Sequence, residues 1–274
     1  MIEVRSYGTT GPYVVLSHGG PGAPGHMAPV ARSLASRFRV LEPLQRGSGS
    51  VPLTVDLHVK DLHEVIQSID NSEPLFLAGS SWGAMLALAY TAAHPARVDG
   101  LVLIGCGTFD IASRARFEAN LQERTDDQLR ARMQRLNVEI VDPDERLRLK
   151  ADLLSPLYSH DLITTDSENG RVDAQAFKET WKDMLRLQHA GVYPAAFNSI
   201  KAPVLMIHGA YDPHPGRMIR DSLAPYLPQL EYIELEDCGH YPWLERKARE
   251  EFFACLVRWL SLQADSVRRT TNSK

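Results

Sequence analysis

The chain lacks the features that mark several specialised classes of protein. None of its apolar stretches reaches the roughly 20 residues that a membrane-spanning helix requires. Its net charge is only −4 over 274 residues, so we expect neither a nucleic acid nor a membrane as a partner. Internal repeats and low-complexity segments are absent from the sequence. What remains is an ordinary globular composition, 44% hydrophobic and 23% charged, which can bury a sizeable core.

Cysteine is also scarce. The three cysteines, Cys106, Cys238 and Cys255, are scattered and odd in number, and their spacing is not that of a metal site. We therefore expect reduced thiols, no metal, no cofactor and a cytoplasmic protein. The first residues lack the basic and then apolar layout of a signal peptide and are typical of a strand instead.

Short apolar runs recur along the chain and predict a sheet. They occupy residues 13–17, 38–41, 75–78, 101–104, 204–207 and 230–235. Segments with helical spacing separate them, the clearest at residues 54–70, 84–93 and 245–260, with Thr54 as an expected N-cap. Nearly continuous apolar strands that alternate with helices indicate an α/β protein whose mostly parallel central sheet is flanked by helices on both faces.

This alternation stops between about residues 105 and 200, where the pattern becomes helical. Helices are expected at residues 144–154 and 173–189, with a capping-box pattern at 125–128 and a loop at 161–171. A helical block inserted above the carboxyl ends of two strands would cover a cleft. We therefore predict a core formed by residues 1–105 and 201–263, a helical cap at 106–200, and a disordered polar tail at 264–274.

The most informative motif is Gly-Ser-Ser-Trp-Gly at residues 79–83. It lies between a predicted strand and a predicted helix, and Gly-x-Ser-x-Gly in that setting is typical of a nucleophile elbow. The central residue is Ser81, which such a corner holds exposed in a strained backbone conformation. Ser80 has no glycine two residues to either side. We predict that Ser81 is a nucleophile.

A nucleophilic serine needs a base, an acid that orients the base, and N–H donors for an oxyanion. His240 follows the last predicted strand and is the expected base. Asp212 follows the strand at residues 204–207 and is the expected acid. The chain order Ser, Asp, His is the one that a strand–elbow–helix architecture uses. Asp237 remains an alternative acid, although its place beside the histidine suits a turn better.

The motif His-Gly-Gly-Pro-Gly at residues 18–22 follows an early strand and predicts the second wall of an oxyanion site. The backbone N–H groups of Gly20 and Trp82 are the expected donors. We expect His18 to brace this loop through hydrogen bonds. His214 lies near Asp212 in the sequence but lacks a position after the last strand, so we do not assign it as the base.

Together these residues resemble the α/β-hydrolase fold, and His-Gly-Gly-Pro-Gly makes the chain similar to the proline iminopeptidase-like group, peptidase family S33. Gln-Arg-Gly-Ser-Gly-Ser at residues 45–50 looks like the Gln-Arg-Gly-x-Gly-x-Ser loop of that group. Residues 80–90 and 94–98 are similar to the group almost throughout. Leu44 departs from the group, in which an aspartate usually precedes Gln-Arg-Gly. The resemblance covers both core segments and does not reach into the cap.

The resemblance implies a serine hydrolase that forms an acyl-enzyme on a small molecule or short peptide and releases an N-terminal proline or a similar residue. A small-ester or lactone hydrolase is the alternative. In aminopeptidase members, acids on the cap grip the free amine of the substrate, and this cap offers Glu118, Glu123, Glu139, Asp152, Glu179 and Asp183. Trp181 and Trp243 are candidate substrate-binding residues.

Two other classes of protein would require different residues at the predicted site. A non-catalytic ligand-binding protein of the same fold is expected to lack a member of the triad, and none is missing here. Haloalkane or epoxide chemistry requires an aspartate where Ser81 stands. The sequence leaves the oligomeric state open.

Overall fold

The computed structural model describes residues 2–23, 25–70, 72–163 and 172–272. The strands are β1 (Val4–Tyr7), β2 (Tyr13–Ser17), β3 (Arg39–Pro43), β4 (Leu75–Ser80), β5 (Gly100–Ile104), β6 (Val204–Gly209) and β7 (Leu230–Leu235). The α-helices are α1 (Ala28–Leu34), α2 (Val55–Gln67), α3 (Trp82–Ala93), α4 (Ile111–Arg124), α5 (Asp127–Glu139), α6 (Pro143–Tyr158), α7 (Ala174–His189), α8 (Gly216–Leu223) and α9 (Arg249–Asn272). Two short 3-10 helices, η1 (Ala195–Ser199) and η2 (Pro242–Leu244), complete the described elements.

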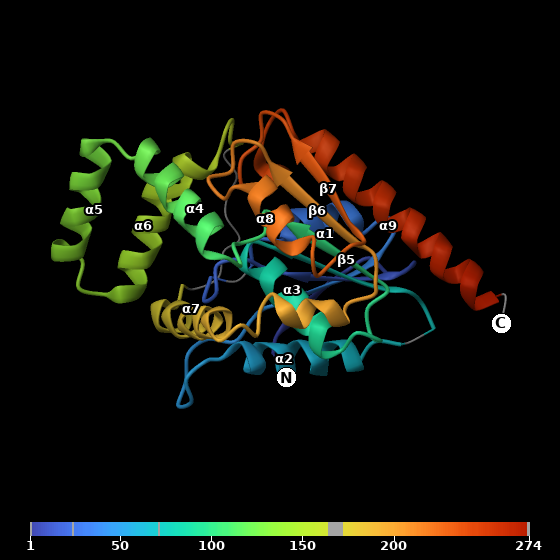
Figure 1. Ribbon diagram of the computed structural model, residues 1–274. Coiled ribbons are helices and arrows are strands. Elements are labelled where there is room, and N and C mark those ends of the chain that lie inside the picture. Colours follow the sequence, from blue (N-terminus) through green and yellow to red (C-terminus); the bar gives the residue numbers. More distant parts are fainter. Residues whose placement is uncertain (1, 24, 71, 164–171, 273–274) are drawn as a thin grey trace.

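Seven strands in the described residues form one sheet in the order β1-β3-β2-β4-β5-β6-β7. Only β1 runs antiparallel to its neighbour, and the other pairs are parallel. The predicted mostly parallel sheet flanked by helices is therefore confirmed (Figure 1). Because β4, β5 and β6 are adjacent and parallel, the loops that follow them meet at one edge of the sheet.

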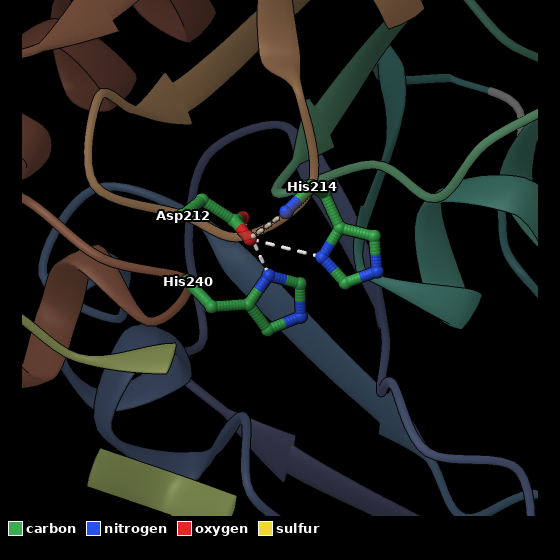
Figure 2. Close-up of side chains that lie close together, drawn as sticks. All are labelled: Asp212, His214 and His240. Carbon is green, nitrogen blue, oxygen red and sulfur yellow. Dashed lines mark hydrogen bonds and ion pairs between the residues drawn. The ribbon is translucent and has the colours of Figure 1, made fainter. Parts of the chain in front are cut away.

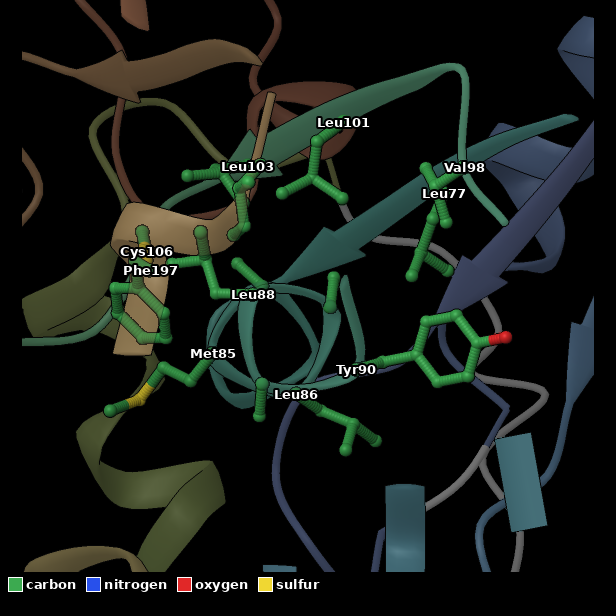
Figure 3. Packing of buried hydrophobic residues seen from close by; sticks show 14 of the residues in the cluster. Leu77, Met85, Leu86, Leu88, Tyr90, Val98, Leu101, Leu103, Cys106 and Phe197 are labelled. Carbon is green, nitrogen blue, oxygen red and sulfur yellow. The ribbon is translucent and has the colours of Figure 1, made fainter. Parts of the chain in front are cut away.

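Alternate side chains of the strands enter two separate hydrophobic cores. Leu77, Leu101 and Leu103 face the core formed with α2 and α3, whereas Phe76 and Val102 face the core formed with α1 and α9. Figure 3 shows the first of these cores around α3. Successive side chains of a strand point to opposite faces of the sheet. Because both faces are apolar here, the central strands appear in the sequence as continuous apolar runs and not as alternating polar and apolar residues.

Helices α4 to α7 lie between β5 and β6 along the chain, and we call residues 106–200 the cap. Figure 1 shows α5 and α6 standing away from the body of the molecule, and neither helix has a buried residue. Their N-termini are stabilised locally, since Asp126 accepts a hydrogen bond from Leu129 N. Most of the predicted loop at residues 161–171 lies outside the described residues.

The C-terminal helix differs from the prediction at both ends. It begins at Arg249 rather than at residue 245, because η2 and a β-bridge of Glu245 occupy the preceding segment. It then continues to Asn272, so the predicted disordered tail is wrong for residues 264–272. Ala264 is buried against the second core, and Arg268 pairs with Glu73 at 2.7 Å. These contacts hold the polar end of the helix on the core.

None of the helices in the described ranges combines the length and the apolar composition that crossing a membrane would require.

Candidate active site

Ser81 sits in a sharp corner between β4 and α3. Its backbone angles are φ 54° and ψ −117°, a conformation that costs a residue with a side chain about 1–3 kcal/mol. The flanking glycines allow the corner to close. A Cβ at Gly79 would lie 2.1 Å from the carbonyl oxygen of Gly83, and a Cβ at Gly83 would lie 2.1 Å from that of Ser17.

The two adjacent serines have different surroundings. Ser81 is partly exposed, and its N–H donates to the carbonyl of Ile104 at 2.8 Å. Ser80 is fully buried, and its hydroxyl has no partner in the described part of the chain. The corner therefore presents the hydroxyl of Ser81 and hides that of Ser80.

His240 and Asp212 come together from the loops after β7 and β6. The Nδ1 of His240 lies 2.6 Å from Oδ2 of Asp212, and both side chains are almost completely buried. The loops touch closely, since a Cβ at Gly209 would lie 2.2 Å from the carbonyl oxygen of Gly239. Gly105, directly after β5, packs against the imidazole of His240. Because Ile104 receives the N–H of Ser81, the end of β5 contacts both the elbow and His240.

Asp212 is surrounded by imidazoles (Figure 2). Its Oδ1 accepts from the backbone N–H and from Nδ1 of His214, both at 2.9 Å. Its Oδ2 also lies 3.2 Å from Nε2 of His208. Burial alone would raise the pKa of the Asp212 carboxyl, but the combined fields of His240, His214 and His208 outweigh it and hold that pKa well below its usual range. Asp212 is therefore ionised at neutral pH.

Asp237, the alternative acid, lies elsewhere. Its side chain is about half exposed, and it pairs with Lys247 Nζ at 2.9 Å and with His160 at 3.4 Å. Its φ of 48° belongs to a turn residue. The acid that contacts His240 is Asp212.

Hydrogen bonds tie the Gly20 loop to the elbow. Gln45 donates its backbone N–H to Nε2 of His18 at 3.0 Å and its side-chain amide to the carbonyl of His18 at 2.8 Å. Its amide oxygen accepts from Nε1 of Trp82 at 2.7 Å. The structure thus places His18 where it braces the loop. Burial lowers its pKa to about 4, so its ring is neutral.

The N–H groups of Gly20 and Trp82 make no hydrogen bond within the described residues. Gly20 has a φ of 53°, and Trp82 is the first residue of α3. A helix N-terminus carries unpaired N–H groups and a partial positive charge. The arrangement can therefore receive an anionic oxygen beside Ser81.

The model of the Alpha/beta hydrolase family matches residues 14–254, which is most of the chain. The chain belongs to the α/β-hydrolase family. The expectation of a hydrolase of this fold is confirmed.

Individual relatives are more distant. A proline iminopeptidase of Lactobacillus crispatus is 25% identical over 90% of this chain and 89% of its own length. A pimeloyl-acyl-carrier-protein methyl ester esterase of Nitrosomonas europaea is 25% identical over 93% and 97%. Among solved structures, the enol-lactonase of Burkholderia xenovorans LB400 superposes with a TM-score of 0.63 and 20% identity, covering 94% of this chain and 96% of that one. Because these relatives differ in activity, they leave the substrate of this hydrolase open.

The two candidate tryptophans occupy different environments in this α/β hydrolase. Trp181, on α7, is half-buried and meets the indole of Trp82 edge-on at 5.8 Å. Trp243 is only 2% exposed and stacks on His26 inside the second core. Trp181 thus contacts the residue that follows Ser81, whereas Trp243 packs in the interior behind the Gly20 loop.

The cap is joined to the loop of His240 by one buried carboxylate. Glu245 accepts the backbone N–H groups of Gly239, His160 and Asp161 at 3.1, 3.0 and 2.7 Å. The N–H of His240 donates to the carbonyl of Tyr158 at 2.7 Å. The sequence contains no signal for Glu245, since only its contacts distinguish it from other polar residues, and it marks Gln45 only as part of the motif at residues 45–50.

One group in the described residues has the spacing of a metal site. The ligand atoms of Asp212, His214 and His240 all lie within 4.8 Å of one another. The carboxylate and the two Nδ1 atoms are already paired by hydrogen bonds. The arrangement is therefore that of an acid holding two imidazoles, and the expectation that no metal takes part stays a prediction.

Proposed function

We propose that this α/β hydrolase is a serine hydrolase that cleaves a small acyl ester or lactone, with Ser81 as nucleophile, His240 as base and Asp212 as acid. The strained conformation of Ser81 is the observation that carries the proposal. Such strain persists only where the surrounding structure imposes it, and it is concentrated at functional sites. Here it leaves Ser81 partly exposed, whereas Ser80 and Trp82 on either side of it are buried.

The mechanism follows from the hydrogen bonds of the pair. Asp212 accepts from Nδ1 of His240, so Nε2 of His240 carries the lone pair and accepts the proton of Ser81 Oγ as that oxygen attacks the carbonyl. The N–H groups of Gly20 and Trp82 stabilise the oxyanion, and losing one such donor costs about 3–4 kcal/mol. His240 then protonates the leaving group. Water, deprotonated by His240, releases the acyl group from Ser81.

Ser81 Oγ makes no hydrogen bond within the described residues. Contacts between a nucleophile and its base are often long in a free enzyme and shorten when the substrate binds. The end of β5 contacts the backbone of Ser81 and the imidazole of His240, so both residues lie at the same edge of the sheet.

The positions of the six acids named for the cap from the sequence favour an ester or lactone over an aminopeptidase substrate. On α7, Glu179 and Asp183 accept the backbone N–H groups of Leu53 and Val55 at 2.8 and 2.9 Å. These carboxylates thus hold the segment of the core that leads into α2. The remaining candidates lie exposed on the outer helices: Glu118, Glu123, Glu139 and Asp152.

Around His240 the side chains are aromatic. Tyr158 and Tyr241 meet its ring edge-on at 5.5 and 4.8 Å, and His214 stacks on it at 4.7 Å. Such surroundings suit an uncharged acyl group better than a protonated amine, which requires a carboxylate partner. This reverses the order of substrates that the family resemblance implies.

An aminopeptidase is the second candidate, supported by the His-Gly-Gly-Pro-Gly motif at residues 18–22 and by relatives named proline iminopeptidase. Parallel assays with short p-nitrophenyl esters, small lactones and proline naphthylamide separate the two. Turnover confined to proline naphthylamide would establish the aminopeptidase instead. Stabilisation by a substrate without any turnover would point to a non-catalytic binder.

A fluorophosphonate probe tests the nucleophile directly. We expect wild type and the matched control Ser80→Ala to be labelled at one site, because the hydroxyl of Ser80 is buried without a partner. Ser81→Ala should lose the label and lower kcat at least about 1,000-fold. An unlabelled wild type, or turnover by Ser81→Ala at a rate close to that of the wild type, would reject the proposed mechanism.

A further inference from the structure

Three rings stack from the cap to the base of the proposed triad. Phe117, on α4, lies on the ring of His214 with centroids 4.1 Å apart and planes 14° apart. His214 in turn lies on the ring of His240 at 4.7 Å and 24°. The stack therefore connects a cap helix with the imidazole that contacts Asp212.

His214 also makes the hydrogen bonds to one of the two oxygens of the Asp212 carboxylate. Its backbone N–H and its Nδ1 both donate to Oδ1, while His240 donates to Oδ2. Donors on both oxygens prevent the carboxylate from rotating about its terminal bond. Figure 2 shows the two neighbouring rings, each joined to the carboxylate by a dashed line.

The acid loop has a second tie to the same cap helix. Asn120, on α4, donates its side-chain amide to the carbonyl of Pro213 at 2.8 Å. Pro213 lies between Asp212 and His214, so α4 contacts the loop at two neighbouring residues. A shift of α4 would therefore move the carboxylate that orients the base.

We propose that His214 is a positioning residue: it holds the Asp212 carboxylate in the orientation that His240 requires and couples that orientation to cap helix α4. This inference rests on the proposed serine-hydrolase function. His214 accepts no proton from the substrate in this scheme and acts only through Asp212 and His240.

Removing the Nδ1 donor should be visible in the pH profile. A carboxylate with fewer donors holds the Nδ1 proton of His240 more strongly, so the acid limb of the labelling profile should move to higher pH. The other titratable groups that face the pair are His208 from β6, Tyr158 from α6, and Tyr241 and His26 from the adjoining loops. They stay in place in every variant below.

The test uses the second-order rate of fluorophosphonate labelling at Ser81 as a function of pH, which requires no knowledge of the substrate. His214→Phe keeps the ring and removes the donor, and we expect the rate to fall about tenfold or more, with the acid limb shifted upward. His214→Asn places an amide N–H near the position of Nδ1 and should stay within about threefold of wild type. Phe117→Leu, which removes only the outer ring of the stack, should lower the rate about threefold.

His63→Phe is the matched control. His63 stacks on His94 at 3.8 Å and contacts the hydroxyl of Tyr90, remote from the acid loop. We expect its labelling rate and pH profile to equal those of wild type. Melting curves of all variants distinguish a slower reaction from a loss of folded protein.

Equal loss in His214→Phe and His214→Asn, or no loss and no shift in His214→Phe, would overturn the positioning role. If His214→Phe does not fold, an unchanged labelling rate in Phe117→Leu would overturn the proposed coupling of His214 to α4, because that variant removes the ring of α4 that stacks on His214. Failure of the wild type to react would instead remove the proposed function, and the inference with it.

Discussion

Helices α3 and α5 are of nearly equal length, 12 and 13 residues, yet they are held in place by opposite means. Every residue from Trp82 to Thr91 in α3 is buried, whereas α5 has no buried residue. Close packing against β2 and β4 sets the position of α3. Helix α5 depends on its N-cap and on partly covered contacts with α6. The helix that follows Ser81 is thus fixed by tertiary packing, and the outer cap helix is not.

Of the substitutions that test this difference between the two helices, Gly83→Ala in α3 should have the largest effect. A Cβ there would meet the carbonyl oxygen of Ser17 at 2.1 Å, so Gly83→Ala must push α3 away from β2 and the Gly20 loop. We expect a fluorophosphonate labelling rate lower by at least about 100-fold and a loss of about 3 kcal/mol in the free energy of unfolding. Gly49→Ala is the control, because nothing lies within 4 Å of that Cβ. Similar behaviour of the two variants would contradict the importance of the close approach.

The same Leu→Ala substitution in the core and in α5 compares how much each region contributes to the free energy of unfolding. Leu103 in β5 is completely buried, so Leu103→Ala should cost about 3–4 kcal/mol in the free energy of unfolding. Leu136 in α5 is only partly covered, and Leu136→Ala should cost about 1 kcal/mol or less. Chemical denaturation of both variants gives the two values. Equal costs would mean that α5 is integrated into the core.

A smaller effect is expected from a buried imidazole beside the elbow. His58 is 2% exposed and meets Trp82 edge-on, and burial lowers its pKa to about 4. Its contribution to stability is fully present above the unfolded-state pKa of about 6.5 and is lost as the pH falls toward 4, because the unfolded chain takes up the proton first. His58→Gln should thus make the fall in unfolding free energy between pH 7.5 and pH 5 smaller by about 2 kcal/mol.

Denaturant titrations at the two pH values measure this difference. The neutral His18, whose pKa burial also lowers to about 4, remains in the variant, so part of the pH dependence should persist. An unchanged pH dependence in His58→Gln would show that His58 does not titrate as its burial implies.

The carboxyl edge of the sheet was largely predictable. The glycines at residues 79 and 83 are required by contacts of 2.1 Å, and a requirement of that kind restricts a position to one amino acid. The motif around Ser81 can therefore be identified from the sequence alone. Thr54, predicted as an N-cap, accepts a hydrogen bond from Leu57 N at 3.2 Å, a contact that also depends only on neighbouring residues.

Elsewhere the prediction failed because remote contacts decide the outcome. The polar segment at residues 264–272 has the composition of a loose tail, but Ala264 and Arg268 attach it to the body. Glu179 and Asp183 look like solvated residues of a helix, yet they cap a loop more than 120 positions away in the chain. No local sequence pattern predicts such remote partners.

The sequence by itself determined the sheet, the sharp corner at Ser81 and the loops that carry Asp212 and His240, because each depends on apolar runs and on glycines that tolerate no side chain. Tertiary structure alone decided which acids of the cap are engaged, which tryptophan contacts the elbow, and that His214 shares Asp212 with His240. Those outcomes depend on the distance and orientation of side chains from separate elements. Such distances and orientations leave no local pattern in the sequence from which they could be predicted.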